Sequence, residues 1–278
     1  MRSTLREVLV LVVVFGLLLG GLFVYTKNWP PAVIVESGSM MHADSEVTFG
    51  RLGTIDPGDL VLVKRIARGE DVGTLVEEGG EHYGAAGEVI VFYSAGDRAR
   101  TPIIHRAVAY VDVDEATREY RVRWSAEAPC VGGAVKETSD GVAWCTYATG
   151  ITIPSLGLDD YRPIRSGFLT KGDNPVTNRG TDQVSGIARD ENGVASPVPI
   201  EWVEGAARAE LPWVGLVKLA LAGKPNQDHP PGAWVQIGWA SAPQDLWIML
   251  GITLAALVGV PLAMDGYRAF RARQAKRS

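Results

Sequence analysis

The chain has few residues of the kinds that hold metals or cofactors. Among 278 residues there are only two cysteines and four histidines, and no group of histidines, cysteines and carboxylates has the spacing of a metal site. A glycine-rich phosphate-binding loop, a low-complexity tract and an Asn-x-Ser/Thr glycosylation site are also absent from the sequence. Metal, nucleotide and other cofactor chemistry is therefore not expected.

Charged residues are missing from a long run near the beginning of the chain. Val8–Tyr25 holds 18 uncharged, mainly apolar residues, and a helix of that length crosses most of a hydrocarbon layer of about 30 Å. Arg2 and Arg6 ahead of it would also suit a cleavable signal peptide. However, the run is longer than the usual apolar region of such a peptide, and no small-x-small cleavage site follows it. We therefore predict a cytoplasmic N-terminus at 1–7 and a retained transmembrane helix at 8–26.

A second apolar run, Leu246–Met264, lies near the other end of the chain. Only Thr253 and Pro261 interrupt its 19 residues, and five basic residues follow it. A buried core helix is the alternative, but basic residues beside a membrane span mark its cytoplasmic end. We therefore predict a transmembrane helix at 245–264 and a basic cytoplasmic tail at 265–278, with both termini in the cytoplasm.

The segment between the two runs, 27–244, is then an acidic extracytoplasmic domain. The chain has 27 basic and 32 acidic residues; seven basic and two acidic residues lie in 1–26 and 265–278, which leaves 20 and 30 for the rest. Such an excess of negative charge excludes nucleic acid as a partner. Cys130 and Cys145 both lie in this segment, where disulfides persist, but the sequence leaves open whether they pair.

The sequence of the outward segment has the pattern of β-strands. Short stretches rich in β-branched and aromatic residues are bounded mostly by Gly, Pro and Asp, and no long helical periodicity intervenes. The predicted strands cover 32–36, 59–64, 88–93, 103–113 and 120–124. The predicted surface insertions lie near 68–87, 125–166 and 188–199. We expect a mainly β domain between the two apolar helices.

A serine that could act as a nucleophile stands shortly after the first apolar run, in Ser37-Gly38-Ser39-Met40. A serine hydroxyl is weak until a base takes its proton, and histidine is the usual base. His105 stands within an apolar predicted strand, where a polar side chain must be either functional or simply hydrogen-bonded in the core. The other three histidines, His42, His82 and His229, stand in sequence typical of loops.

Two aspartates could orient such a histidine. Asp173 stands in Lys171-Gly172-Asp173-Asn174-Pro175, and Asp182 follows nine residues later. A carboxylate on the far side of an imidazole fixes its tautomer and stabilises the imidazolium. The Gly-Asp-Asn-Pro sequence is also typical of a turn in which the aspartate bonds its own backbone. Lys64 and Lys171 are alternative bases, since a desolvated lysine can take the serine proton.

The order of these blocks resembles that of the type I signal peptidases, in the branch found in archaea and the endoplasmic reticulum. After the apolar span, the matching blocks are Ser37-Gly38-Ser39-Met40, Gly58-Asp59-Leu60-Val61-Leu62-Val63-Lys64-Arg65, Glu88-Val89-Ile90-Val91-Phe92, His105-Arg106 and Gly167-Phe168-Leu169-Thr170-Lys171-Gly172-Asp173-Asn174. The resemblance covers residues 8–65, 87–112, 166–183 and 200–220, and it leaves the insertions outside.

The resemblance implies a role for each matching residue. Ser39 matches the nucleophile, and His105 matches the general base, where bacterial relatives carry a lysine. Ser37 matches a hydroxyl that binds the oxyanion together with the Ser39 backbone N–H. Asp182, or alternatively Asp173, matches the acid that orients His105. Candidates for the shallow apolar pockets that bind small substrate side chains are Ile34, Val35 and Ile104.

Two features depart from the family pattern. His42 stands where the family usually has a proline. The acid block continues with Pro175, and a strict offset places Asn178 where the orienting aspartate belongs. An amide cannot stabilise an imidazolium as a carboxylate does, so we favour a local insertion that makes Asp182 the match.

The resemblance implies a signal-peptidase-like β fold and a membrane-bound serine endopeptidase that removes signal peptides from exported preproteins after small residues. The expected partners are secretory preproteins, the lipid bilayer and the protein translocation machinery. The expected location is the cell membrane, or the endoplasmic reticulum membrane in a eukaryote. Two alternatives remain: a non-catalytic paralogue that binds preproteins, and a specialised membrane peptidase with a narrow substrate set.

Overall fold

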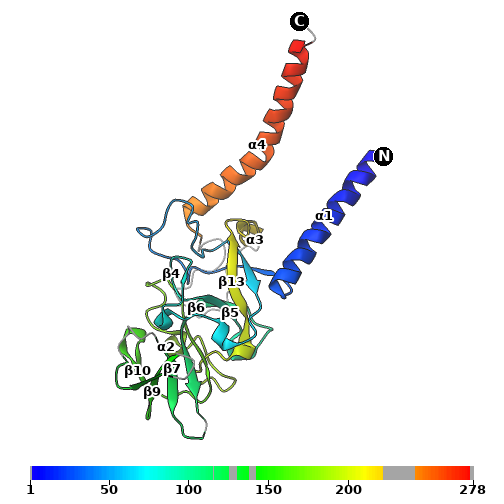
Figure 1. Cartoon of the computed structure of the whole chain (residues 1–278). Helices are drawn as coiled ribbons and strands as arrows, with labels where there is room; N and C mark the ends of the chain where they lie inside the picture. The colour runs from blue at the N-terminus through cyan, green and yellow to red at the C-terminus, as the bar shows by residue number, and fades with distance from the viewer. Residues whose placement is uncertain (1, 115, 125–129, 138–141, 222–241, 276–278) are drawn as a thin grey trace.

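A computed structural model places a β domain between one long helix near each end of the chain (Figure 1). The structure describes residues 2–114, 116–124, 130–137, 142–221 and 242–275. The predicted fold class is therefore confirmed in its coarse form, as a mostly antiparallel β domain flanked by two long apolar helices.

The two long helices are α1 (Arg2–Thr26) and α4 (Gln244–Ala275). Both leave the same end of the β domain, so the two chain ends lie on one side of it (Figure 1). Within these helices, Arg6–Thr26 and Gln244–Arg268 are long and apolar enough to cross a membrane. Almost none of either stretch is buried against the protein, which does not fit the alternative of a buried core helix for 245–264.

The β domain is built on one sheet in which neighbouring strands run antiparallel. In spatial order its strands are β1 (Ala32–Ile34), β2 (Leu60–Lys64), β13 (Val203–Leu211), β5 (Val89–Phe92), β6 (Ile103–Val113), β7 (Tyr120–Arg123), β9 (Ala143–Tyr147) and β8 (Ala134–Glu137), while β12 (Gly167–Lys171) pairs with β6 beside this path.

Smaller elements surround the sheet. Two separate strand pairs are β3 (Glu81–His82) with β4 (Ala85–Ala86), and β10 (Ile151–Ile153) with β11 (Leu158–Tyr161). The short helices are α2 (Asp182–Ser185) and α3 (Leu216–Leu221), with 3₁₀ turns at η1 (Gly69–Asp71), η2 (Leu75–Glu77), η3 (Ser94–Gly96), η4 (Pro154–Leu156) and η5 (Ile200–Trp202).

The five strands predicted from the sequence are all present, as β1, β2, β5, β6 and β7. The turn ahead of β2 has a local cause. Gly58 has φ +97°, and a Cβ there would lie 2.3 Å from Leu216, so both conformation and space require glycine. The Val35 N–H donates to the Asp59 carbonyl at 3.0 Å, which ties β1 to this turn.

The stretch 125–166 differs from its prediction as a surface insertion. Its described parts supply β8 and β9 to the main sheet and form the β10–β11 pair. Cys145, Tyr147 and Ile151 are buried in the core that β6 and β7 also line. Short apolar strands separated by Gly-rich and acidic sequence therefore conceal a part of the core; residues 125–129 and 138–141 lie outside the described residues.

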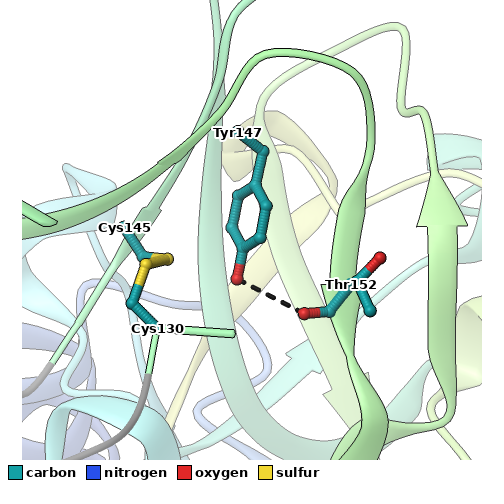
Figure 2. The surroundings of a disulfide bond; sticks show 4 residues. All are labelled: Cys130, Cys145, Tyr147 and Thr152. Carbon is teal, nitrogen blue, oxygen red and sulfur yellow. Dashed lines mark hydrogen bonds between the residues drawn. A yellow bond between two sulfur atoms is a disulfide. The ribbon is translucent and has the colours of Figure 1, made fainter. Parts of the chain in front are cut away.

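The two cysteines, whose pairing the sequence left open, form a disulfide. Figure 2 shows the Cys130–Cys145 bond close to Tyr147, whose hydroxyl donates to the Thr152 carbonyl at 3.4 Å. Because Cys145 belongs to β9, the bond ties the chain that precedes β8 to the sheet.

Candidate active site

The Ser39 loop follows β1 directly and is anchored by the residue after the serine. Met40 is buried in a cluster with Val35, Val61 and Val89, from β2, β5 and the end of β1. The Met41 N–H donates to the Gly38 carbonyl at 3.2 Å, which closes a tight turn. A buried methionine on one side of the turn thus holds the Ser39 side chain on the other, as expected for a packing residue.

His105 projects from β6 toward this turn. Its strand pairs with β5, where His105 lies opposite Ile90, and its side chain is almost fully buried. The His105 Nε2 atom lies 3.0 Å from the Ser39 Oγ atom. A buried histidine in an apolar strand is therefore within hydrogen-bonding distance of the predicted nucleophile.

Asp182 is the carboxylate that lies behind His105. Its Oδ2 atom is 2.7 Å from His105 Nδ1, and its side chain is completely buried. The same oxygen accepts a hydrogen bond from the Thr170 hydroxyl at 2.6 Å. Two donors therefore meet one carboxylate oxygen, which fixes the carboxylate against the imidazole.

Gln183 explains how Asp182 comes to this place. It follows Asp182 in α2, and its side chain accepts from the Thr170 backbone N–H at 3.3 Å and donates to the Phe168 and Ser196 carbonyls at 3.4 and 3.3 Å. Thr170 and Phe168 belong to β12, which pairs with β6. The glutamine thus locks the start of α2 onto the strand that neighbours His105.

The arrangement can activate Ser39 as a nucleophile. A carboxylate only accepts hydrogen bonds, so Asp182 assigns the imidazole proton to Nδ1 and leaves the Nε2 lone pair facing the Ser39 hydroxyl. When Nε2 takes the hydroxyl proton, the buried carboxylate stabilises the imidazolium that forms. The structure therefore brings together Ser39, His105 and Asp182, three of the four residues predicted to be catalytic.

Asp173, the fourth, faces a different cation. Its carboxylate accepts from Arg106 Nε at 2.9 Å and from a second guanidinium nitrogen of Arg106. His42 Nε2 lies 3.4 Å from the same carboxylate. Asp173 thus neither orients His105 nor bonds its own backbone as a turn aspartate would. It closes an ion pair whose arginine also donates to the carbonyls of His82, Ala85 and Gly87.

These contacts move two pKa values in opposite directions. Burial opposes ionisation of Asp173, but hydrogen bonds from His42 and Arg106 outweigh it and hold the Asp173 pKa below its usual range. The hydrogen bond with Asp173 raises the pKa of His42, although burial alone would lower it. His42 therefore bonds Asp173 and not Ser39, in accord with its position just past the turn.

The predicted substrate-binding residues lie around the same turn. The Ser37 hydroxyl is 3.3 Å from the Ser39 hydroxyl. Ile104 is half-buried against the cluster around Met40, while Ile34 is half-buried on the other side of β1, beside Leu216. Val35 is buried within the cluster. Ile34 and Ile104 thus keep some exposed surface that a substrate could contact, and Val35 acts as a packing residue.

The remaining candidate bases lie apart from Ser39. Lys64 is positioned over the Tyr25 ring at 5.1 Å, and Lys171 lies opposite Arg106 in the β12–β6 ladder. His82 belongs to the β3–β4 pair. His229 lies outside the described residues. Within the part of the chain that the structure describes, no three His, Cys, Asp or Glu residues gather as a metal site would require.

Sequence reasoning did not single out three residues of the site. Thr170 supports Asp182, Arg106 binds Asp173, and Asn174 contacts the Ser39 turn. All three stand inside the motif blocks, so their position beside the candidate residues was a usable signal. In comparisons with known proteins, the chain matches no family model and no curated protein. The case for its chemistry therefore depends on the site itself.

Proposed function

We propose that this protein is a membrane-bound serine endopeptidase that removes signal peptides from preproteins, with a signal-peptidase-like catalytic domain. The observation that carries the proposal is the chain of contacts Ser39 Oγ to His105 Nε2 at 3.0 Å and His105 Nδ1 to Asp182 at 2.7 Å. The position of Ser39 only 13 residues after the end of α1 supports a substrate that is itself anchored in the membrane.

The proposed reaction follows from these contacts. As His105 Nε2 takes the Ser39 proton, Ser39 Oγ bonds to the scissile carbonyl carbon and the carbonyl π electrons move to oxygen. The Ser39 backbone N–H and the Ser37 hydroxyl are the donors proposed for that oxyanion. The C–N bond then breaks, and the His105 proton goes to the leaving amine. Water, deprotonated by the same histidine, hydrolyses the acyl-enzyme and restores Ser39.

The substrate would bind extended beside β1. Among the described residues, β1 is the end of the sheet path, with β2 as its neighbour in the sheet. An extended peptide can add to such an edge through main-chain hydrogen bonds. The half-buried Ile34 and Ile104 would limit the space for side chains there, which favours small residues before the cleaved bond.

The test is cleavage of a preprotein by the detergent-solubilised full-length protein. Ser39→Ala and His105→Ala should each lower turnover by about 10⁴-fold or more, with the double variant little worse, because the members of such a site act as a unit. His105→Lys should not restore cleavage. His82→Ala removes a histidine in the small β3–β4 pair and is the matched control, expected to cleave at the wild-type rate.

The outcomes separate the proposal from its alternatives. Cleavage by the wild type excludes a non-catalytic preprotein-binding protein, and cleavage of several unrelated preproteins excludes a narrow processing peptidase. If His105→Ala cleaves as fast as His82→Ala, the assignment of the base is wrong.

A further inference from the structure

The loop between β12 and α2 contacts the turn that carries Ser39. In this Gly172–Asn178 segment, the Asn174 side-chain amide donates to the Gly38 carbonyl at 2.7 Å. The Asn174 backbone N–H and the Asn178 side-chain amide both donate to the Ser39 carbonyl, at 2.9 and 3.0 Å. Both peptide groups that flank the Ser39 Cα atom are therefore held from outside the turn.

The Gly38 contact has a consequence for the Ser39 N–H. The Gly38 carbonyl and the Ser39 N–H belong to one planar trans peptide, so they point in opposite directions. When Asn174 holds the carbonyl on its own side, the N–H must point to the other side. Among the described residues, no protein acceptor takes the Ser39 N–H. It is thus a backbone donor that remains available next to the nucleophile.

Close packing keeps the segment against the turn. Gly172 adjoins the Ser39 carbonyl, and a Cβ added there would lie 2.4 Å from that oxygen and 2.6 Å from the Asn178 side chain. Asp173, the next residue, is bound to the buried Arg106. The ion pair that does not orient His105 therefore has another use, because it fixes the start of the segment.

We infer that Asn174 is a positioning residue for the oxyanion site: it holds the Gly38–Ser39 peptide so that the Ser39 N–H points at the carbonyl oxygen of the substrate. Asn178 and the Asn174 backbone hold the next peptide, so the backbone on either side of Ser39 does not rotate as charge develops. A donor that is already aimed needs no reorganisation when the oxyanion forms, and that is the source of its effect. This inference rests on the proposed function.

The first experiment measures preprotein cleavage by Asn174→Ala and Asn174→Asp. Aspartate keeps the Oδ1 atom that accepts from the Val176 N–H at 3.0 Å and removes only the donor to Gly38. Both variants should lower kcat by about 10- to 100-fold, a part of the effect of losing an oxyanion donor altogether. KM should stay within about twofold, and the pH profile of kcat/KM should not move, because His105 keeps its contacts.

A second measurement needs no preprotein. A fluorophosphonate reacts when Ser39 Oγ bonds to phosphorus, fluoride leaves, and His105 takes the hydroxyl proton; its phosphoryl oxygen occupies the oxyanion position. The labelling rate should fall in both Asn174 variants by about the same factor as kcat. Val176→Ala, at an exposed position in the same segment, is the matched control and should label at the wild-type rate. Ser39→Ala gives the background.

The outcomes distinguish the inference from the proposed function. If the wild type is labelled but cleaves no preprotein, the proposed function is wrong, and the labelling rates of the Asn174 variants still decide the inference. Wild-type labelling rates in Asn174→Ala and Asn174→Asp would overturn the inference alone. Should Asn174→Ala melt well below the wild type, Asn174→Asp decides. A wild type that neither cleaves nor labels would overturn both proposals.

Discussion

Asp182 and Asp173 stand nine residues apart, and each carboxylate binds a different cation or cation-to-be. Asp182 faces only His105 and the Thr170 hydroxyl, so its charge is directed at the imidazole. Asp173 is shared between Arg106 and His42. The burial of both is similar, and their partners alone separate a proposed catalytic role from a structural one.

The sequence could place both aspartates near the site but could not choose between them with certainty. A strict offset pointed to Asn178, and only the assumed local insertion favoured Asp182. What decides the matter is the grip of Gln183 on β12, together with the Asn178 contact to the Ser39 carbonyl. Such contacts join residues that are far apart in sequence, and spacing alone does not encode them.

The first prediction concerns these two aspartates. Asp182→Asn should lower kcat by about 10²- to 10⁴-fold with little change in melting temperature, because an amide facing Nδ1 favours the wrong tautomer of His105. Asp173→Asn should instead destabilise the fold by about 3 kcal/mol, since it leaves the buried Arg106 without a carboxylate. Preprotein cleavage and thermal melts of both variants test the contrast. The reverse ranking would assign the orienting role to Asp173.

The second prediction concerns pH and His42. Because Asp173 raises the pKa of His42, the folded protein holds this proton more tightly than the unfolded chain does. The resulting stabilisation is complete below the unfolded pKa of about 6.5, and it is lost as the pH rises through the higher folded pKa. The nearby charges are Asp173, Arg106 and the exposed Glu46. The melting temperature of the wild type should therefore exceed that of His42→Gln most clearly in acid.

The measurement is a series of thermal melts from about pH 5.5 to pH 9, a range that spans the histidine titration. His82→Gln is the control, because no charged partner of the His82 side chain is found among the described residues. A difference between wild type and His42→Gln that stays constant over the whole range would contradict the ion pair.

Among the elements, the strands were predictable and their partners were not. β-branched runs such as Glu88–Tyr93 and Ile103–Val113 identify strands locally, because each occupies a pleated, buried surface. The order in the sheet depends on long-range pairing, as with β13, which inserts between β2 and β5. The stretch 125–166 was predicted as an insertion because its strands are short and its linkers polar, yet β9 completes the core around Tyr147.

The third prediction concerns the disulfide in that core. The bond closes a loop with a sequence separation of 15, for which loop-closure entropy predicts a stabilisation of about 3 kcal/mol. Replacing Cys130 and Cys145 together by alanine should lower the melting temperature. Cleavage below the new melting point should persist, because Cys145 pairs through Val122 with Val111, which lies about 20 Å along β6 from His105. Loss of cleavage in a folded double variant would contradict this separation.

For the whole molecule, the arrangement of the two long helices agrees with the charge pattern of the sequence. α1 runs toward the β domain and α4 runs away from it, and both lie at the same end (Figure 1). The sequence adds basic residues beyond the apolar run at each outer end. Together these features favour a protein whose two termini share one side of a membrane and whose β domain lies on the other.

The last prediction tests this topology with cysteines introduced one at a time into the Cys130→Ala, Cys145→Ala background. Val176→Cys, at an exposed position close to Ser39 in the fold, should react with a membrane-impermeant maleimide on intact cells. Ser3→Cys and Gln274→Cys, at the outer ends of α1 and α4, should react only after permeabilisation. Because signal peptides are removed on the side to which preproteins are exported, labelling of Val176→Cys only after permeabilisation would contradict both the topology and the proposed reaction. Labelling of Ser3→Cys alone on intact cells would show that α1 and α4 do not place their outer ends on the same side.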